Sequence, residues 1–262
     1  MATTKNIQSV ERAFAVLELY QKKDVEELGV KEISDALGLN KSTAFGLINT
    51  LNNLEYLQRN PVNQKYALGV RLLSLSDAVK LKSAIIRTVH PYLEQIMQKY
   101  GETVHCGVEH RNGVLYIDKV EATHSAIYIN SQIGKVNDYH CTGVGKCILA
   151  YLPPERQKQI YAEPLKTMTY NTITNVEQLR NEIRKVRENG FAMDNEENAL
   201  GLSCVAVPVF SAAETVGCAI SVSGMTSRIQ HACQHGIIEE LKQISAEVSK
   251  KTFGYDCGRE EK

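Results

Sequence analysis

The sequence predicts an α+β protein in two parts, an N-terminal winged helix-turn-helix unit and a larger domain built on an antiparallel sheet. Two patterns carry this prediction. Residues 1–69 show three segments with helical apolar spacing, followed by two short strand-like segments. Beyond that region, short β-branched runs separated by turn residues alternate with amphipathic helical segments. A chain of 262 residues, 43% of them apolar, is long enough to bury two cores.

Three helices are predicted at the N-terminus. The first covers residues 9–21, where Ser9 is placed to cap its first turn, and the second ends just before Gly38. Gly38 can adopt the left-handed conformation that terminates a helix, and Asn40 can cap the third helix at residues 41–54. Two helices that cross around a glycine turn are typical of the helix-turn-helix motif.

A β-hairpin and a linker helix follow. Residues 56–60 and 65–68 are strand-like and flank the turn-forming residues 61–64, and a hairpin in this place makes the unit a winged helix. Residues 70–82 are predicted to form a linker helix that is apolar almost all round. Its large apolar residues include Leu72, Leu73, Val79 and Leu81. Because soluble monomers rarely expose such a surface, we expect this helix to pack against a second subunit or domain.

The larger domain is expected to span residues 83–253, before a tail at residues 254–262. It is predicted to begin with a helix at residues 83–100 that Pro91 interrupts. Strands are expected at residues 103–109, 113–121, 126–131, 204–210 and 215–222. Later helices are expected after Thr142, after a capping box at residues 174–177, and at residues 237–248. Neighbouring short strands of this kind indicate an antiparallel sheet.

Composition and targeting signals exclude several classes of protein. Residues 199–213 carry no charge but are too few to span a bilayer, and the N-terminus lacks the apolar core of a signal peptide. The seven cysteines include no CxxC pair, which argues against a disulfide framework and against a zinc ribbon. We therefore expect a cytoplasmic protein with reduced thiols, no membrane partner and no cofactor.

Charge is balanced over the whole chain but not along it. The 30 Lys and Arg residues equal the 30 Asp and Glu residues, yet residues 40–90 carry seven basic residues against two acidic ones. Positive charge gathered in one segment is what binding to the phosphates of a nucleic acid needs, although an ordinary solvated face would have the same composition. Together with the helix-turn-helix spacing, the charge favours double-stranded DNA as the partner.

The predicted DNA-binding residues lie on the third helix and on the hairpin. On or beside the face directed at the major groove are Lys41, Ser42, Thr43, Phe45, Gly46 and Asn49. Asn49 suits readout of adenine, and Phe45 suits contact with a thymine methyl group. On the hairpin, Arg59 and Lys65 are expected to contact phosphate or the minor groove.

These segments resemble IclR-type transcriptional regulators. In the first part the resemblance rests on SVERA at residues 9–13, LNKST at 39–43 and YALG at 66–69. In the second part it rests on GETVH at 101–105, HCTGVGK at 140–146, GFAMDNEE at 190–197, CVAVPV at 204–209 and ISVSG at 220–224. The resemblance extends from residue 7 to about residue 253.

The resemblance implies both an architecture and a function. It implies a winged helix, a dimerising linker helix and a GAF-like effector-binding domain, assembled as a homodimer or homotetramer. Such a protein binds a pseudo-palindromic operator and acts as a repressor or an activator that responds to a small organic acid. Phe45 and Gly46 depart from the polar or basic residues that the family often has at these positions. The operator sequence is therefore not implied.

The same resemblance assigns an effector site. It implies that the ligand contacts the amides of Gly143 and Val144 and the side chains of four residues, Asp194, Cys204, Ser221 and Ser223. The sequence gives a physical reason for the amides, because the start of a helix presents free N–H groups to a carboxylate. A carboxyl group such as Asp194 beside an anion favours a hydroxy acid or a hydrated keto acid as the ligand.

The sequence also offers residues for two other kinds of site, a nucleophilic catalytic set and a metal site. Cys204, His140 and Asp194 could form a nucleophilic catalytic set, but a thiol within an apolar strand lacks the electropositive setting of a reactive thiolate. The same three residues, and the alternating His and Cys residues of segment 231–235, offer metal-ligand types. Alternation by two does not converge on one side of a helix. We predict that the chain is not an enzyme and holds no obligatory metal.

Overall fold

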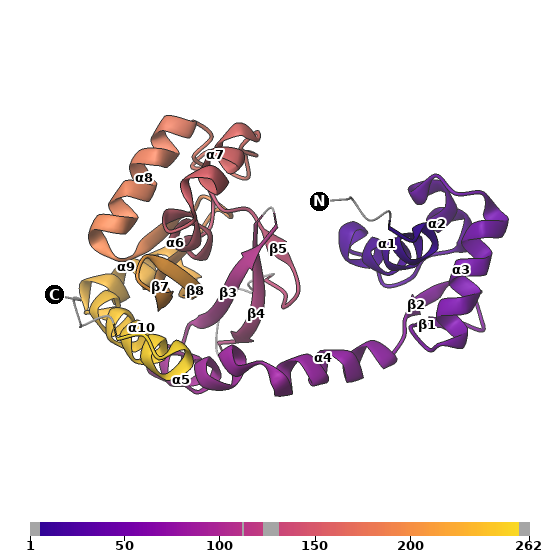
Figure 1. The fold of residues 1–262 in the computed structure, drawn as a ribbon, viewed down its shortest axis with the longest axis horizontal. Helices are drawn as coiled ribbons and strands as arrows, with labels where there is room; N and C mark the ends of the chain where they lie inside the picture. Colours follow the sequence, from indigo (N-terminus) through magenta and orange to yellow (C-terminus); the bar gives the residue numbers. More distant parts are fainter. Residues whose placement is uncertain (1–5, 112, 123–130, 257–262) are drawn as a thin grey trace. The chain divides into compact units, whose positions relative to one another are not determined.

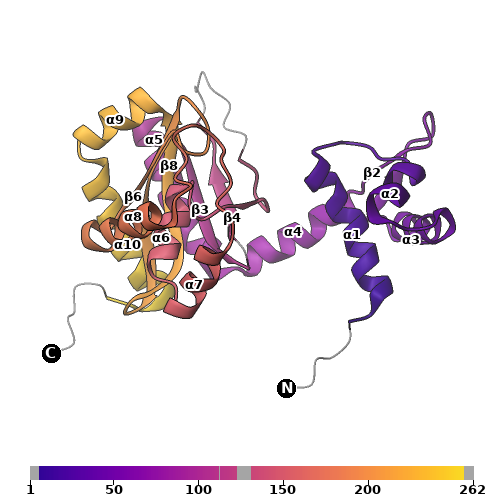
Figure 2. The same cartoon turned by 90° about the horizontal axis from the view of Figure 1, so that it is seen from above.

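The computed structural model describes residues 6–111, 113–122 and 131–256, without the side chains of residues 80–82. The chain divides into two compact units that meet between Lys82 and Ser83, and both are drawn in Figures 1 and 2. None of the helices in the described ranges combines the length and the hydropathy that a membrane span requires. Of the strand expected at residues 126–131, all but Ser131 lies outside the described residues.

The first unit contains the predicted winged helix-turn-helix. In chain order its elements are α1 (Gln8–Lys23), α2 (Val30–Leu37), α3 (Lys41–Asn53), β1 (Leu57–Arg59), β2 (Tyr66–Leu68) and α4 (Arg71–Lys82). The two strands pair antiparallel, with Gln58 opposite Ala67. A buried apolar cluster joins α1, α2, α3 and the hairpin; it includes Val16, Ile33, Ala44, Ile48 and Leu57. This cluster fixes α3 by one face and leaves its other face outward.

Local signals account for the turn between α2 and α3. Gly38 has φ 61°, in the left-handed region that ends a helix, as the sequence predicts. The Asn40 side chain accepts a hydrogen bond of 2.8 Å from the Thr43 amide and so caps α3. The cap predicted for the first helix is wrong. Helix α1 begins at Gln8 with Ile7 as its N-cap residue, so Ser9 already lies inside the helix.

The second unit is built on a six-stranded antiparallel sheet with strand order β5-β4-β3-β8-β7-β6. The strands are β3 (Thr103–His110), β4 (Gly113–Val120), β5 (Val136–Asn137), β6 (Ala192–Asn195), β7 (Leu202–Ala212) and β8 (Thr215–Met225). Its helices are α5 (Ala84–Tyr100), α6 (Gly143–Ala150), α7 (Pro154–Ala162), α8 (Val176–Asn189), α9 (Thr226–Gln234) and α10 (Ile237–Phe253). The α+β class is thereby confirmed.

Helices cover both faces of this sheet (Figure 1). On one face, residues of α5, α9 and α10 pack against Val205 and Val207 of β7. On the other, residues of α6, α7 and α8 pack against Ala206 of β7 and Ala219 of β8. Successive strand residues therefore serve two separate cores, which explains why β7 reads as a nearly continuous apolar run. The small alanines allow α6 to approach the sheet closely.

Several predicted details of the second unit differ from the structure. Helix α5 runs through Pro91 without a break, held by the buried Val89 and Leu93 on either side of it. The cap of α8 is Asn175, whose side chain accepts from the Gln178 amide at 3.0 Å, so the capping box predicted from Thr174 is displaced by one residue. Strands β5 and β6 and helices α7 and α9 were not predicted from the sequence. Strand β5 is two residues long, and β6 ends in Asp and Asn, which are poor strand formers.

Candidate functional site

The outward face of α3 is polar and accessible. Lys41, Ser42, Phe45, Gly46 and Asn49 are exposed, and Phe45 retains 50% of its surface. Thr43, also predicted for this face, is half-buried. A side chain at position 46 would meet no atom of the chain within 4 Å, so internal packing does not require a glycine there. Contacts within the chain therefore do not account for the glycine at this position of the face.

The hairpin residues predicted to contact DNA are also exposed. The guanidinium of Arg59 lies 5.9 Å from the centre of the Tyr66 ring, and the Arg59 amide donates to the Asn52 side chain at 3.1 Å. Lys65 forms an ion pair of 3.2 Å with Glu32, and both side chains are about half exposed. Exposed ion pairs are weak, so Lys65 can exchange Glu32 for a phosphate at little cost. The hydrogen bond between Arg59 and Asn52 connects the hairpin to α3.

The second unit encloses a cavity of about 130 Å³ between the start of α6 and the sheet. Its lining combines polar and apolar surface and consists of His105, Tyr116, Ser131, Asn137, Thr142, Asp194, Asn198, Ala199, Leu202, Ser203, Cys204 and Ser223. We call this space the effector cavity. Its lining contains no Lys or Arg side chain among the described residues, so an anion would have to be bound by neutral donors and by the helix end.

Three of the predicted effector residues line this cavity. Asp194, Cys204 and Ser223 stand directly opposite one another on β6, β7 and β8, so they form a row across the sheet. The other three, Gly143, Val144 and Ser221, are buried beside the cavity but are not part of its lining. The Ser221 hydroxyl is buried and has no hydrogen-bond partner among the described residues.

The glycines at the start of α6 have a packing role. A Cβ atom at Gly143 would lie 2.8 Å from the Cys204 sulfur, and one at Gly145 would lie 2.5 Å from the Tyr139 carbonyl oxygen. The Gly143 amide hydrogen-bonds to the Cys204 sulfur, and the Gly145 amide donates to the Thr142 hydroxyl at 3.0 Å. These two amides therefore have partners inside the protein. In the described hydrogen bonds, the Val144 amide is left as the free donor of this first turn.

Nine residues of the lining were not among the predicted effector residues, and they include His105, Tyr116, Asn137 and Thr142. His105 Nε2 lies 2.6 Å from the Ser131 hydroxyl, and the imidazole stacks on the Tyr116 ring at 4.9 Å. Complete burial, followed by the charge of Lys119, lowers the pKa of His105 to about 3, so the ring is neutral. A polar His in an otherwise apolar strand was the one sequence signal that could have revealed this residue.

Asp194 is the acidic group of the cavity. Burial raises its pKa to about 7, against the opposing effect of the Glu197 amide, which donates to its carboxylate at 2.8 Å. Glu197 in turn accepts from the Lys146 ammonium at 2.6 Å. Lys146 is fully buried and also donates to the Met193 carbonyl oxygen at 2.9 Å. A buried charged network thus fixes the backbone that presents Asp194.

The nucleophilic set weighed from the sequence is not assembled. Burial raises the pKa of the Cys204 thiol far above its usual range, which keeps it protonated. His140 Nε2 is hydrogen-bonded to the Lys166 carbonyl oxygen at 2.9 Å. Among the described residues, neither the set of Cys204, His140 and Asp194 nor segment 231–235 brings three ligand atoms together; His140 is grouped instead with Asp138 and Cys141.

Comparisons with known proteins agree with this geometry. The model of the IclR helix-turn-helix domain matches residues 9–61, and that of the C-terminal domain of bacterial IclR transcriptional regulators matches residues 78–250. The HTH-type transcriptional regulator XynR of Escherichia coli is 36% identical over 95% of this chain and 98% of its own.

Solved structures give the same result. An IclR transcriptional regulator from Alicyclobacillus acidocaldarius, 28% identical, superposes with a TM-score of 0.86 over 95% of this chain and 100% of its own. The IclR protein of Thermotoga maritima, 31% identical, gives 0.75 over the same shares. Family and relatives are transcriptional regulators rather than enzymes, and they bind DNA through the helix-turn-helix. This chain belongs to the IclR family of bacterial transcriptional regulators.

Proposed function

We propose that this regulator responds to a small organic acid that binds in the effector cavity and changes the affinity of the first unit for its operator. The observation that carries the proposal is the row of Asp194, Cys204 and Ser223 in the lining of the effector cavity. Polar side chains that converge in such a space are typical of ligand sites. In the described hydrogen bonds, the buried Asn137 amide nitrogen of the lining has no partner.

The chemistry of the lining favours an acid with a further hydroxyl or hydrated keto oxygen. Hydroxyl, amide and imidazole N–H groups would hold the carboxylate, supported by the Val144 amide at the positive end of α6. Asp194, with its raised pKa, is the partner for the second oxygen, because it donates when protonated and accepts from a ligand hydroxyl when ionised. A volume of about 130 Å³ favours a compact ligand.

For DNA, we propose that α3 enters the major groove. Lys41, Ser42, Thr43, Phe45, Gly46 and Asn49 would lie on or beside the contact face. Arg59 and Lys65 of the hairpin would contact phosphate or the minor groove. The exposure of Lys41, Phe45 and Asn49 supports the proposal, since base readout needs side chains that DNA can reach.

For assembly, we propose a homodimer or homotetramer that buries α4. Along and just before this helix, Val70, Leu73, Leu75 and Val79 are each at least half exposed within the single chain. A row of this kind favours association with a second copy. Replacing Leu72 and Val79 together by Glu is expected to dissociate the assembly, as measured by light scattering; a stable dimer of the double variant would place the interface elsewhere.

The proposed function is tested by a screen of thermal unfolding against keto, hydroxy, sugar and aromatic acids. A ligand present at about 100 times its dissociation constant adds about 2.7 kcal/mol to the free energy of unfolding, which gives a clear shift of the midpoint. We expect the strongest shift from a small hydroxy or keto acid, and we expect the same compound to alter operator binding. A cation as the strongest ligand would contradict the proposal.

A further inference from the structure

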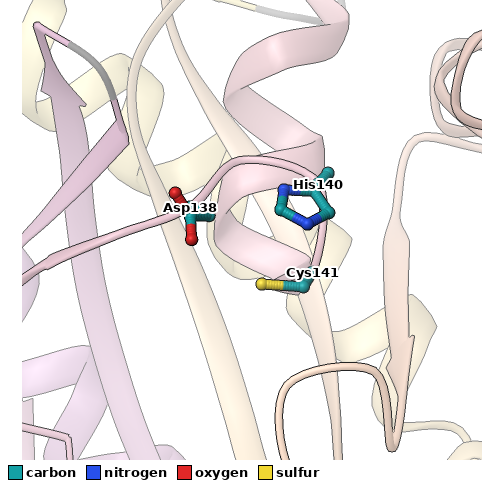
Figure 3. A group of neighbouring side chains, drawn as sticks. All are labelled: Asp138, His140 and Cys141. Atoms are coloured by element: carbon teal, nitrogen blue, oxygen red, sulfur yellow. The ribbon is translucent and has the colours of Figure 1, made fainter. Parts of the chain in front are cut away.

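The loop between β5 and α6 brings together three side chains of metal-binding type. Asp138, His140 and Cys141 each offer one ligand atom, and these three atoms all lie within 4.8 Å of one another (Figure 3). Tetrahedral zinc, with bonds of about 2.0–2.3 Å, holds its ligand atoms at about 3–4 Å separation. The three ligand atoms therefore lie only slightly farther apart than the ligands of a zinc ion.

The hydrogen bond of His140 prepares the ring for a metal. Its Nε2 lies 2.9 Å from the Lys166 carbonyl oxygen, which can only accept a hydrogen bond. The proton of the neutral imidazole therefore sits on Nε2, and the lone pair of Nδ1 is free. A ligating histidine commonly donates its second N–H to a backbone carbonyl in just this way.

Charge and burial at this place also favour a divalent cation. Cys141 and His140 are almost fully buried, and Asp138 is half-buried. The Cys141 sulfur also lies in the field of the carboxyl groups of Asp138, Asp194 and Glu197, which the charge of Lys146 only partly opposes. A divalent ion would balance one thiolate and one carboxylate, so the loaded site is neutral.

The ion has a route to this group. Asp138 and His140 also line a surface hollow of about 580 Å³ beside α7, which is separate from the effector cavity. Water from this hollow could complete the coordination, and so could the Asn198 side-chain oxygen, which lies 3.8 Å from the Cys141 sulfur. A thiolate ligand disfavours magnesium and calcium, and the combination of Cys, His and Asp suits zinc.

We propose that Asp138, His140 and Cys141 form a zinc site at the entrance to α6. This site differs from the two candidate metal-ligand sets of the sequence analysis, which were Cys204 with His140 and Asp194, and segment 231–235. Its other two ligands, Asp138 and Cys141, flank His140 within one loop. The ion would tie this loop directly before Thr142, the residue that caps α6. Asp138, His140 and Cys141 are not part of the lining of the effector cavity, although Asn198, which lies beside Cys141, is.

The test is a cobalt(II) titration of the full chain after treatment with a chelator. We expect one cobalt per chain, a thiolate-to-cobalt charge-transfer band, the visible bands of tetrahedral cobalt, and loss of all of them when zinc is added. Cys141→Ala is expected to remove the charge-transfer band. Cys204→Ala, which alters another buried thiol of the same unit, is the matched control and is expected to keep it.

A second variant guards against misfolding. Asp138→Asn keeps the shape of a half-buried side chain and is expected to lower zinc affinity by at least about tenfold, with the circular dichroism spectrum unchanged. The proposal is overturned if the chelator-treated protein takes up no cobalt, if Cys204→Ala removes the band while Cys141→Ala keeps it, or if folded Asp138→Asn protein binds zinc as tightly as the parent chain.

Discussion

The two candidate binding surfaces differ in how their polar groups are held. On α3, Phe45 and Asn49 are exposed and are fixed only through the buried face of the helix. In the effector cavity, His105 and Asp194 are buried and hydrogen-bonded to the residues around them. The first surface can therefore change its specificity at little cost in stability. Changes at His105 or Asp194 in the second surface are expected to cost more stability, because both side chains are buried and hydrogen-bonded within the protein.

The largest expected difference between the two units is the loss of stability when an ion pair is broken. Lys146→Met would leave Glu197 buried without its partner, and breaking a buried pair in this way costs about 3–5 kcal/mol. Lys22→Met breaks the exposed pair with Glu18 in the first unit and is expected to leave stability almost unchanged. Urea unfolding measures both. Equal stability of the two variants would show that the network around Asp194 is not structural.

The buried groups of the cavity, unlike the exposed side chains of α3, should also make the free energy of unfolding depend on pH. Because the folded pKa of Asp194 is raised from 3.8 to about 7, its contribution to stability is complete below the unfolded pKa and is lost as pH rises toward 7, by up to about 1.4 kcal/mol per unit. His105 acts in the opposite direction, since its lowered pKa makes the folded state less stable as pH falls below 6.5.

The two effects partly cancel in the parent chain, so the comparison with Asp194→Asn isolates one of them. Removing the carboxyl should remove the loss of stability that Asp194 causes with rising pH while keeping the opposite effect of His105, so the free energy of unfolding should rise more steeply with pH between about 4 and 6.5 than in the parent chain. Unfolding by urea over this range gives the slopes. Parallel curves for the parent and the variant would mean that Asp194 titrates normally in the folded protein.

A smaller effect is expected on α3, and it should appear in DNA binding rather than in stability. Asn49→Ala is expected to relax base preference at one position of each half-site, at a cost of about 1–3 kcal/mol. Lys65→Ala should weaken all sequences alike and reduce the salt dependence of binding. Operator titrations at several salt concentrations separate the two. Equal, sequence-independent losses would refute the assignment of Asn49 to base readout.

The same contrast explains what could be predicted from the sequence. The turn at Gly38 and the cap at Asn40 depend on neighbouring residues, so local patterns were sufficient. The cavity depends on strand register: Asp194, Cys204 and Ser223 lie far apart in the chain and meet only across three strands. Family resemblance supplied those three, but it did not indicate His105, Tyr116 or Asn137. No local periodicity marks them, because their neighbours come from other strands.

The glycines in the first turn of α6 show the same limit of local sequence patterns. Gly143 and Gly145 suggest a carboxylate-binding helix start, and the structure gives both a packing reason. Gly143 packs closely against Cys204, and Gly145 packs closely against the Tyr139 backbone. A short motif shows that the backbone approaches something closely, but not whether that partner is a ligand or the protein itself.

The central claim is that an acid held in the cavity controls DNA binding, and Ser223 offers the most direct test. Operator binding is titrated with the acid that stabilises the parent chain most, in the parent, in Ser223→Ala and in Ser227→Ala, an exposed serine on α9. Loss of a hydrogen bond to a charged ligand costs about 1.5–3 kcal/mol, so Ser223→Ala should need at least about tenfold more acid for the same response, while Ser227→Ala should match the parent. An unchanged response in Ser223→Ala would contradict the account.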